Sequence, residues 1–423
     1  MNHYIIRNAH DQNDLQQLRP LFNTIFHPEK VGDLAEMMSR HLPGFQPGHW
    51  FVAEDPNSLS IVSAFALIPW SWKMAGISLK VAEMGIVGTD ADHRGKGLMK
   101  LLNHRFDHRL QEDGYDLAVI QGIPGFYHQF GYHYCIPLEN HLEVPLHIMD
   151  DTIATGFAIR EATLEDIPFL MHQDKIYRQN YFISVNRSKD QWRYLLTHSK
   201  ETEYGADYKI IEHSSREKFY ARFPQAGFGH GVTISEVSEG INWAAMETLM
   251  TYAKSEAIKK GKPYIRLNVS HSSHLAQWAL QKGVQPGLSY AWQIKIVNKS
   301  AWLQKMKPIL EQRLADSPFR GWNHPVRLDF FGEQLDLKWK NGHLKEVCPG
   351  SADHVPHTFC LPPDLCAALL LGHRSWKELQ VNRPDLAPMN QYLRMERQHF
   401  SEETGELIET LFPKCNSWIH ERY

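Results

Sequence analysis

The sequence predicts an α/β protein with α+β character, divided into three domains. Strand-like apolar runs alternate with amphipathic segments from the start of the chain, the opening pattern begins again near residue 151, and the composition changes near residue 300. A chain of 423 residues is long enough for about two to four domains, each with its own core. We therefore expect domains at residues 1–150, 151–299 and 300–423.

The first domain is expected to begin with a strand and helices and to continue as a series of strands. Asp11 or Asn13 can cap the first long helix. Three strands are expected next, at residues 50–53, 61–68 and 79–87. The spacing of apolar residues from Leu98 onward predicts a helix that Gly114 ends, followed by a short buried strand at 115–120.

The second domain is expected to repeat the first. Residues 157–166 repeat the opening strand and capped helix of residues 4–21, which indicates an internal duplication. Later elements are expected as helices at 246–260 and 274–282 and as strands at 264–269 and 290–297. The second copy lacks an Arg-x-x-Gly loop at the matching place.

The third domain is marked by another change of pattern. It is expected to contain a helix over residues 302–314, strands at 326–331 and 334–339, and apolar helical segments at 364–371 and 407–412.

Composition excludes several classes of protein and partner. The chain has 45 Lys and Arg residues against 48 Asp and Glu residues, a formal charge of −3, and no long basic run. Such a chain shows no concentration of positive charge that would attract nucleic acid or an anionic membrane. No apolar run approaches the roughly 20 residues of a membrane span, and the N-terminus does not resemble a signal peptide. Five cysteines without a C-x-x-C pair indicate a reduced, cytoplasmic chain.

The loop Arg94-Gly95-Lys96-Gly97, between an expected strand and an expected helix, is the most informative stretch of the chain. Its glycines allow unusual dihedrals and close approach to a ligand, and the free N–H groups of the following helical turn attract anions. A pyrophosphate would fit there. The alternative is a glycine-containing turn with two exposed cations. Neither a Walker loop nor a G-x-G-x-x-G fingerprint occurs, which argues against a nucleoside triphosphate or a nicotinamide dinucleotide.

Residues 87–99, Val-Gly-Thr-Asp-Ala-Asp-His-Arg-Gly-Lys-Gly-Leu-Met, resemble the acetyl-CoA loop of the GNAT superfamily of N-acetyltransferases, whose pattern is Arg/Gln-x-x-Gly-x-Gly/Ala. Arg94 and Gly97 match this pattern, and Met99 departs from its small final residue. That departure is shared by the Eis-like (enhanced intracellular survival) subgroup, to which the rest of the chain is also similar. Residues 125–132, Gly-Phe-Tyr-His-Gln-Phe-Gly-Tyr, resemble the tyrosine-bearing segment of that subgroup.

This resemblance covers essentially the whole chain and implies its architecture. It implies tandem GNAT-type mixed-sheet domains, the second degenerate and without a cofactor loop, and then a C-terminal sterol-carrier-protein-like α+β domain. The restart near residue 151 and the change near residue 300 fit this layout. Because family members often assemble as hexamers, the resemblance also implies a homo-oligomer, and a hexamer in particular.

The resemblance further implies a site for acetyl-CoA as the acetyl donor. The cofactor-binding residues it implies are Val87, Gly88, Thr89, Arg94, Gly95, Lys96, Gly97, Leu98, Met99, Gly122 and Ile123. Tyr127 matches the general acid of the family, and a phenol with a pKa of about 10 is protonated at neutral pH. From the residues alone, the alternative for Tyr127 is a core tyrosine in an aromatic cluster.

Transfer of an acetyl group to an amine also needs a base. A lysine-type amine has an unperturbed pKa of about 10.4 and must lose a proton before it can attack the thioester. In the family the terminal carboxylate of the chain takes this place, and here that group belongs to Tyr423. Glu83, on the strand before the loop, is the alternative base, since many GNAT enzymes carry a carboxylate on that strand. Two further alternatives stay open: a frayed chain end and an ordinary strand residue at Glu83.

Other constellations in the sequence are set aside. No metal site is expected, because the usual zinc spacings do not match those of Cys348, His354, His357, Cys360 and Cys366. Residues 227–231, Gly-Phe-Gly-His-Gly, are expected to form a flexible turn rather than a phosphate cradle. Without a Gly-x-Ser-x-Gly elbow, a serine hydrolase has no support.

The sequence therefore predicts an acetyl-CoA-dependent N-acetyltransferase, in which a primary amine of a small molecule or of a lysine side chain attacks the thioester directly. The alternative is a non-catalytic protein that binds acyl-CoA or a lipid, using the C-terminal domain. No motif encodes the acceptor, because the walls of a pocket come from segments that are distant in sequence.

Overall fold

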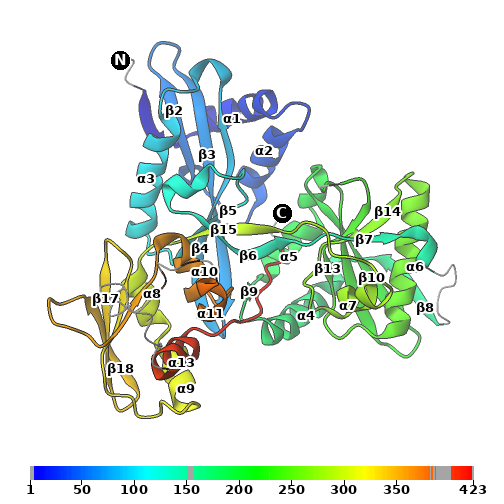
Figure 1. Cartoon of the computed structure of the whole chain (residues 1–423). Coiled ribbons are helices and arrows are strands. Elements are labelled where there is room, and N and C mark those ends of the chain that lie inside the picture. Colours follow the sequence, from blue (N-terminus) through cyan, green and yellow to red (C-terminus); the bar gives the residue numbers. More distant parts are fainter. Residues whose placement is uncertain are drawn as a thin grey trace.

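The computed structural model describes residues 4–149, 156–227, 229–381, 383, 386 and 402–421. Figure 1 shows three units: blue to cyan at upper left, green at right, and yellow to red at lower left. Mixed sheets with flanking helices in two tandem units confirm the expected fold class. No helix in these described ranges is both long and apolar enough to cross a membrane.

The first unit contains the strands and helices that the sequence predicts before residue 121. Its strands are β1 (Ile5–Asn8), β2 (Trp50–Asp55), β3 (Ser60–Met74), β4 (Ile77–Thr89), β5 (Leu117–Ile120), β6 (His133–Glu139) and β7 (Leu142–Pro145). Its helices are α1 (Gln12–Ile25), α2 (Val31–His41) and α3 (Leu98–Glu112). Asp11 caps α1 because its side chain accepts the N–H of Asp14, and Gly114 follows the end of α3 with a left-handed φ of 66°.

The second unit is built from a similar succession of elements. Its strands are β8 (Phe157–Glu161), β9 (Ile183–Val185), β10 (Ala206–His213), β11 (Lys218–Pro224), β12 (Val232–Ile234), β13 (Glu236–Val237), β14 (Tyr264–Leu267) and β15 (Tyr290–Ile296). Its helices are α4 (Ile167–Asn180), α5 (Lys189–Leu196), α6 (Trp243–Lys259) and α7 (His274–Gln281). The helix predicted from Met246 begins at Trp243 instead, because the side chain of Asn242 accepts the N–H of Ala245.

The third unit is a small sheet with helices. The sheet has the order β18-β17-β16-β19 and consists of β16 (Val326–Asp329), β17 (Gln334–Lys340), β18 (His343–Pro349) and β19 (His357–Cys360). The helices are α8 (Lys299–Lys305), α9 (Lys307–Ala315), α10 (Pro363–Leu370), α11 (Trp376–Gln380) and α13 (Glu402–Leu411). The single helix predicted over residues 302–314 is wrong. Pro308 explains the break between α8 and α9, because proline lacks the N–H needed inside a helix and favours a first turn.

Three strands, β7, β9 and β15, lie in sheets that chain order does not suggest. The large sheet has the order β1-β2-β3-β4-β5-β15-β6, with β9 also paired to β3. Thus β15, from the second unit's part of the chain, lies between β5 and β6, while β7 joins the sheet β12-β14-β7. The boundary expected at residue 150 therefore cuts across two sheets, because each tandem unit completes its sheet with a strand from the other.

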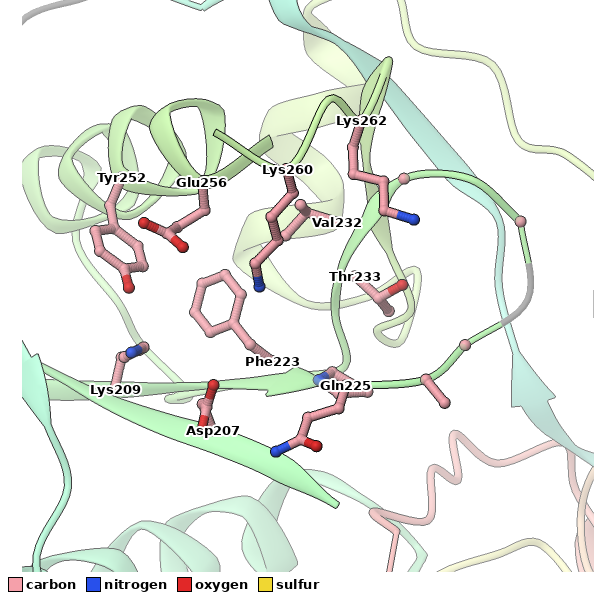
Figure 2. Close-up of a pocket in the computed structure, with 15 residues that line it drawn as sticks. Asp207, Lys209, Phe223, Gln225, Val232, Thr233, Tyr252, Glu256, Lys260 and Lys262 are labelled. Atoms are coloured by element: carbon pink, nitrogen blue, oxygen red, sulfur yellow. The ribbon is translucent and has the colours of Figure 1, made fainter. Parts of the chain in front are cut away.

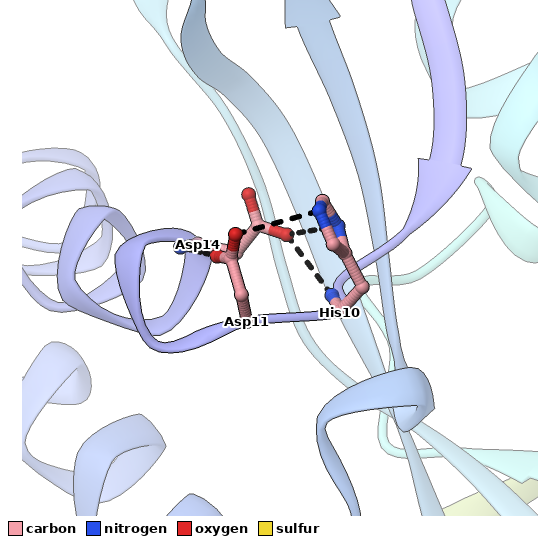
Figure 3. A group of neighbouring side chains, drawn as sticks. All are labelled: His10, Asp11 and Asp14. Atoms are coloured by element: carbon pink, nitrogen blue, oxygen red, sulfur yellow. Dashed lines mark hydrogen bonds and ion pairs between the residues drawn. The ribbon is translucent and has the colours of Figure 1, made fainter.

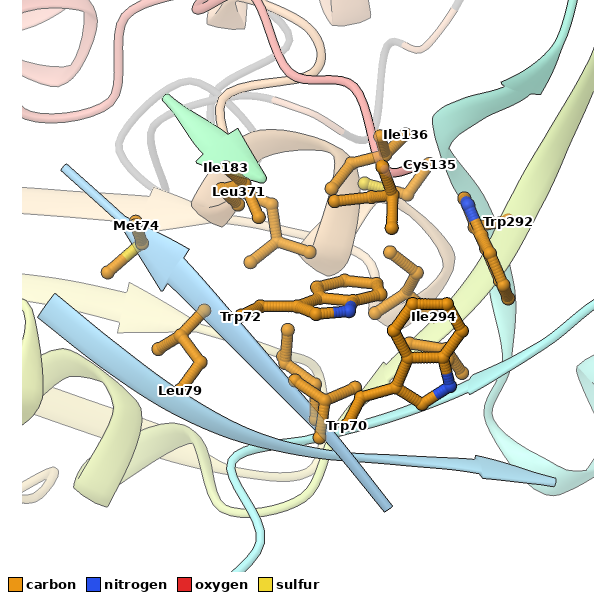
Figure 4. Packing of buried hydrophobic residues seen from close by; sticks show 14 of the residues in the cluster. Trp70, Trp72, Met74, Leu79, Cys135, Ile136, Ile183, Trp292, Ile294 and Leu371 are labelled. Carbon is orange, nitrogen blue, oxygen red and sulfur yellow. The ribbon is translucent and has the colours of Figure 1, made fainter. Parts of the chain in front are cut away.

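Three tryptophans pack at this exchange of strands. Trp70 and Trp72 of β3 and Trp292 of β15 lie edge to face, and the ring centroids of each pair are 6.0 Å apart. Figure 4 shows them in one hydrophobic cluster with Ile183 of β9 and with Leu371, which follows α10. Aromatic side chains bury large apolar areas, so this cluster ties all three units into one core.

The first strands of the tandem units carry the same ion-pair motif. Arg7 of β1 binds both carboxylate oxygens of Asp14, at 2.6 and 2.7 Å, and also a glutamate of β2. Arg160 of β8 binds Asp166 at 2.7 and 2.8 Å and also a glutamate of β10. This repeated bidentate geometry supports the internal duplication that the sequence indicates.

Candidate functional site

The two parallel strands at the centre of the first unit, β4 and β5, pair over a short stretch only. β4 and β5 pair over Val81–Glu83 of β4, and β5 ends at Ile120 while β4 continues along β3. At Ile86 the backbone φ is 51°, an unusual value for a β-branched residue, and the β3–β4 register shifts between Ala64 and Ala66. Beyond Glu83, β4 therefore pairs with β3 alone, and we call this end of the β4–β5 pairing the strand opening.

The predicted anion loop connects the end of β4 to α3. Gly95 and Gly97 have φ values of 72° and 76°, and a Cβ at either position would meet no atom within 4 Å. Gly97 provides no side-chain cap for α3. Among the described residues, no backbone acceptor contacts the N–H groups of Leu98 or Met99. The helix therefore presents free donors to a ligand in open space.

The two basic side chains of the loop are exposed. Nε of Arg94 donates to the carbonyl oxygen of Thr89 at 3.2 Å, which ties the loop to the end of β4. Together with Lys96, Arg94 adds positive charge to the positive end of the α3 dipole. This arrangement suits a polyanion of pyrophosphate type.

Gly88 has a packing role in addition to its place at the opening. A Cβ at Gly88 would lie 2.9 Å from Cδ1 of Ile25, so the glycine allows α1 to pack against β4. Its carbonyl accepts a hydrogen bond from Oγ of Ser63 at 3.2 Å. The neighbouring predicted residues, Val87 and Thr89, are half-buried beside the opening.

Tyr127 begins a short 3₁₀ helix, Tyr127–Phe130, and is only 5% exposed. Its ring packs edge to face with Phe126 and with Tyr132, at centroid distances of 5.0 and 6.3 Å. Burial, and secondarily Tyr290, raises the pKa of Tyr127 above its usual value, so the phenol keeps its proton at neutral pH. The aromatic-cluster interpretation of Tyr127 and its chemistry as a proton donor are therefore compatible.

Gly122, just after β5, supports the ring of Tyr127. A Cβ at Gly122 would lie 2.2 Å from Cδ2 of Tyr127. The carbonyl of Gly122 accepts hydrogen bonds from the hydroxyl of Tyr290 and from Nε2 of Gln293, the latter at 2.6 Å. Two donors already bond to this carbonyl. The clearest role of Gly122 is therefore to leave room for the ring of Tyr127 and so to position it. Ile123, the other residue predicted here, is 66% exposed.

Glu83 is a buried carboxylate at the point where β4 and β5 separate, with 1% of its surface exposed. It accepts hydrogen bonds from Nε1 of Trp70 at 2.8 Å and from Nε2 of Gln121 at 3.3 Å. Carboxyl groups are normally buried at this depth only when they are hydrogen-bonded in this way. The other base candidate, Tyr423, lies outside the described residues.

Four residues around the site escape prediction from the sequence. Trp70 and Gln121 could have been found, since each lies on or directly after a strand that flanks the strand of Glu83. Tyr290 and Gln293 give no such signal. They reach Gly122 only because β15 crosses from the second unit into the large sheet.

One group of possible metal ligands is present in the described residues. Figure 3 shows His10, Asp11 and Asp14, whose ligand atoms lie within 4.8 Å of one another. Asp14 is already engaged by Arg7 and by the N–H of His10, so the group is an ion-paired helix start. In the part of the chain that the structure describes, no metal-ligand group forms from the cysteines and histidines set aside above.

A cavity of about 240 Å³ lies in the second unit, between α6 and the strands β10 and β11. Figure 2 shows Lys209, Tyr252, Glu256 and Lys260 around it. The glycine loop at 229–231 forms part of its wall and packs on a tyrosine ring, because a Cβ at position 231 would lie 2.4 Å from that ring. Close packing against this ring therefore explains why position 231 is a glycine, where the sequence predicts only a flexible turn.

Comparison with known proteins identifies the class of the first unit. The acetyltransferase (GNAT) domain family matches residues 6–135, the segment that contains the strand opening, the loop and Tyr127. These residues form a GNAT acetyltransferase domain, a fold that uses acyl-CoA donors for acyl transfer. No relative is found among curated proteins.

Solved structures extend the similarity to the whole chain. A GCN5-related N-acetyltransferase from Anabaena variabilis ATCC 29413 has a TM-score of 0.67 at 15% identity, covering 99% of each chain. A probable N-acyltransferase from Enterococcus faecalis V583 has a TM-score of 0.67 at 13% identity, covering 100% of each chain. Eis1 from Mycobacterium abscessus has a TM-score of 0.63 at 13% identity, covering 99% of this chain and 100% of the other. At such identities the likeness shows the fold.

Proposed function

We propose that the protein is an acetyl-CoA-dependent N-acetyltransferase of the Eis-like kind, whose reaction takes place in the first unit. One observation carries the proposal: the uncapped, cationic start of α3 follows the end of β4, and buried Tyr127 packs on Gly122 just after the end of β5, the parallel neighbour of β4. The N–H groups of α3, with Arg94 and Lys96, would hold the pyrophosphate of the cofactor. Tyr127 would then serve the thioester end.

The proposed reaction is a direct transfer to a primary amine. The neutral amine attacks the thioester carbon, the new C–N bond forms, and the C–S bond breaks as the tetrahedral intermediate collapses. Tyr127 donates its proton to the departing sulfur, a step for which its raised pKa keeps it protonated. Either the Tyr423 carboxylate or Glu83 accepts the proton of the amine, directly or through water. The acceptor is a small molecule or a lysine side chain.

The remaining parts of the chain complete this proposal. The third unit is the sterol-carrier-protein-like domain, and the protein acts in the cytoplasm as a homo-oligomer. The whole-chain fold similarity to Eis1 from Mycobacterium abscessus supports the subgroup.

Calorimetric titration with acetyl-CoA, followed by measurement of CoA release with a panel of amines, tests the function. We expect binding in the micromolar range and amine-dependent release of free thiol. Absence of binding at millimolar acetyl-CoA would refute the cofactor assignment. Binding without transfer to any amine, together with a lipid retained in native mass spectrometry, would favour a non-catalytic carrier.

A further inference from the structure

The C-terminal tail, residues 413–421, returns from α13 to the junction of the tandem units, as the red segment in Figure 1 shows. The N–H of Phe182 donates to the carbonyl of Asn416 at 2.7 Å, and the N–H of Trp418 donates to the carbonyl of Ile183 at 3.2 Å. The tail therefore runs beside β9, the strand that pairs with β3 of the large sheet.

The end of the described tail enters a buried cluster of charged residues in the second unit. The side chains of Arg187 and Arg222 are both 0% exposed. Arg222 binds the carboxylate of Glu421, and Arg187 donates to Nδ1 of His420 at 3.2 Å. Burial, together with the positive charge of Arg187, lowers the pKa of His420 well below its usual value. The imidazole is therefore neutral and can accept this bond.

Carboxylates of the second unit complete the cluster around the same two arginines. Asp174 accepts from Arg187 at 2.7 Å, and Glu236 accepts from it at 2.9 Å. Glu236 also lies 4.0 Å from Arg222 and accepts the hydroxyl of Tyr220 at 3.2 Å. Buried charges are tolerated only with such partners, so the two tail residues are part of a fixed network.

The position of Glu236 relates this network to the strand opening of the second unit. β12 pairs in parallel with β14 up to Ile234 opposite Leu267, and β13, which starts at Glu236, pairs with β11 instead. This repeats the separation of β4 from β5. The start of α6, however, is capped by Asn242, and Glu239 precedes it where the first unit has cations. The second unit therefore keeps the opening and lacks the anion site.

We infer that the second unit serves as a dock for the C-terminal tail, with Arg187 and Arg222 as positioning residues for the chain end. The inference rests on the proposed function, in which the terminal carboxylate of Tyr423 acts in the first unit. A duplicated domain without a cofactor loop thereby contributes to the reaction of its partner domain: it holds the tail beside β9, where the two units meet.

Digestion of the full chain with carboxypeptidase Y, followed by intact mass spectrometry, tests the dock without any enzymatic assay. Glu421→Gln should lose Trp418 about tenfold faster than the wild type, because losing a charge-assisted hydrogen bond increases the population of the released tail. Glu409→Gln, which changes a carboxylate on α13 outside the cluster, should be trimmed at the wild-type rate. Equal trimming of Glu421→Gln and wild type would overturn the dock.

Kinetics on the same variants test the positioning role. Glu421→Gln and deletion of Tyr423 should each lower kcat and leave the KM for acetyl-CoA unchanged, and combining them should add no further loss. Glu421→Asp should restore part of the turnover. Faster trimming with an unchanged kcat would overturn the positioning role. A kcat lowered by Glu421→Gln but not by deletion of Tyr423 would support the dock and refute the terminal-carboxylate assignment in the proposed function.

Discussion

The ring of Tyr127 lies directly against Gly122, so that a Cβ at position 122 would fall 2.2 Å from Tyr127 Cδ2 and 2.3 Å from Cε2. Such a distance is far below a van der Waals contact. The carbonyl of the same glycine is fixed by Tyr290 and Gln293 of β15. The proposed acid is therefore held on one side by a backbone segment that the second unit's strand positions.

Gly122→Ala should displace the Tyr127 ring. Overpacking of this kind costs about 1–3 kcal/mol of folding free energy. We expect kcat to fall about tenfold or more, since a small misplacement of a catalytic group is costly. Denaturant unfolding and steady-state kinetics measure the two effects. Gly48→Ala is the matched control, because a Cβ there meets no atom within 4 Å. Wild-type behaviour of Gly122→Ala would show that the ring moves without cost.

Tyr127→Phe should remove the proposed proton donor and little else. Loss of a general acid reduces rates by a factor of about 10² or more. We expect a fall of that size in kcat, with the Kd for acetyl-CoA unchanged in calorimetry. Tyr132→Phe in the same aromatic cluster is the control, since the Tyr132 hydroxyl is buried and has no hydrogen-bond partner among the described residues. Equal turnover of Tyr127→Phe and wild type would remove Tyr127 from the acid role.

Arg94→Ala should weaken cofactor binding through loss of charge at the start of α3. A charge-assisted hydrogen bond to a phosphate contributes about 1.5–3 kcal/mol, which corresponds to a loss of affinity of about tenfold or more. Because this attraction is screened by salt, the affinity ratio between wild type and variant should shrink as salt increases. Titration at two salt concentrations measures this. Lys73→Ala, at the far end of β3, should bind acetyl-CoA as the wild type does.

The sequence predicts the local elements of the first unit well because their signals are local. Asp11 caps a helix through its own neighbours, and the glycines at 95 and 97 stand at positive φ where the loop pattern requires them. The exchange of β7 and β15 could not be predicted, because strand order depends on pairing between segments about 120 to 180 residues apart in the chain. For the same reason the support of Gly122 by Tyr290 leaves no trace in any motif.

Trp292→Ala tests whether the exchanged strand is essential to the first unit. The side chain is fully buried against Trp70 and Trp72, and truncating a large core aromatic costs about 3–5 kcal/mol. We expect loss of that stability in denaturant unfolding.

A fragment of residues 1–150 should not fold alone, because β15 separates β5 from β6. Co-expression with residues 151–423 should rescue it. A soluble, cooperatively folded fragment 1–150 would contradict the shared sheet.

Stability should decrease between pH 6.5 and about 4 because of buried histidines. Burial lowers the pKa of His49 and of His373 to about 4, and lowers that of His420 well below its usual value. In the unfolded chain these side chains bind protons near pH 6.5, whereas the folded protein does not, so protonation favours unfolding as the pH falls through this window. Each unit of pKa difference corresponds to about 1.4 kcal/mol. Paired carboxylates such as Asp14 and Asp166 have pKa values lowered from 3.8, so the stability that they contribute is lost only at still lower pH.

Calorimetric melting at pH 7, 6 and 5 should therefore show a falling Tm. His49→Gln should melt with a shallower pH dependence than the wild type, because it removes one of the buried groups with a lowered pKa. A Tm that stays constant from pH 7 to 5 would show that these histidines gain protons in the folded state as readily as in the unfolded chain.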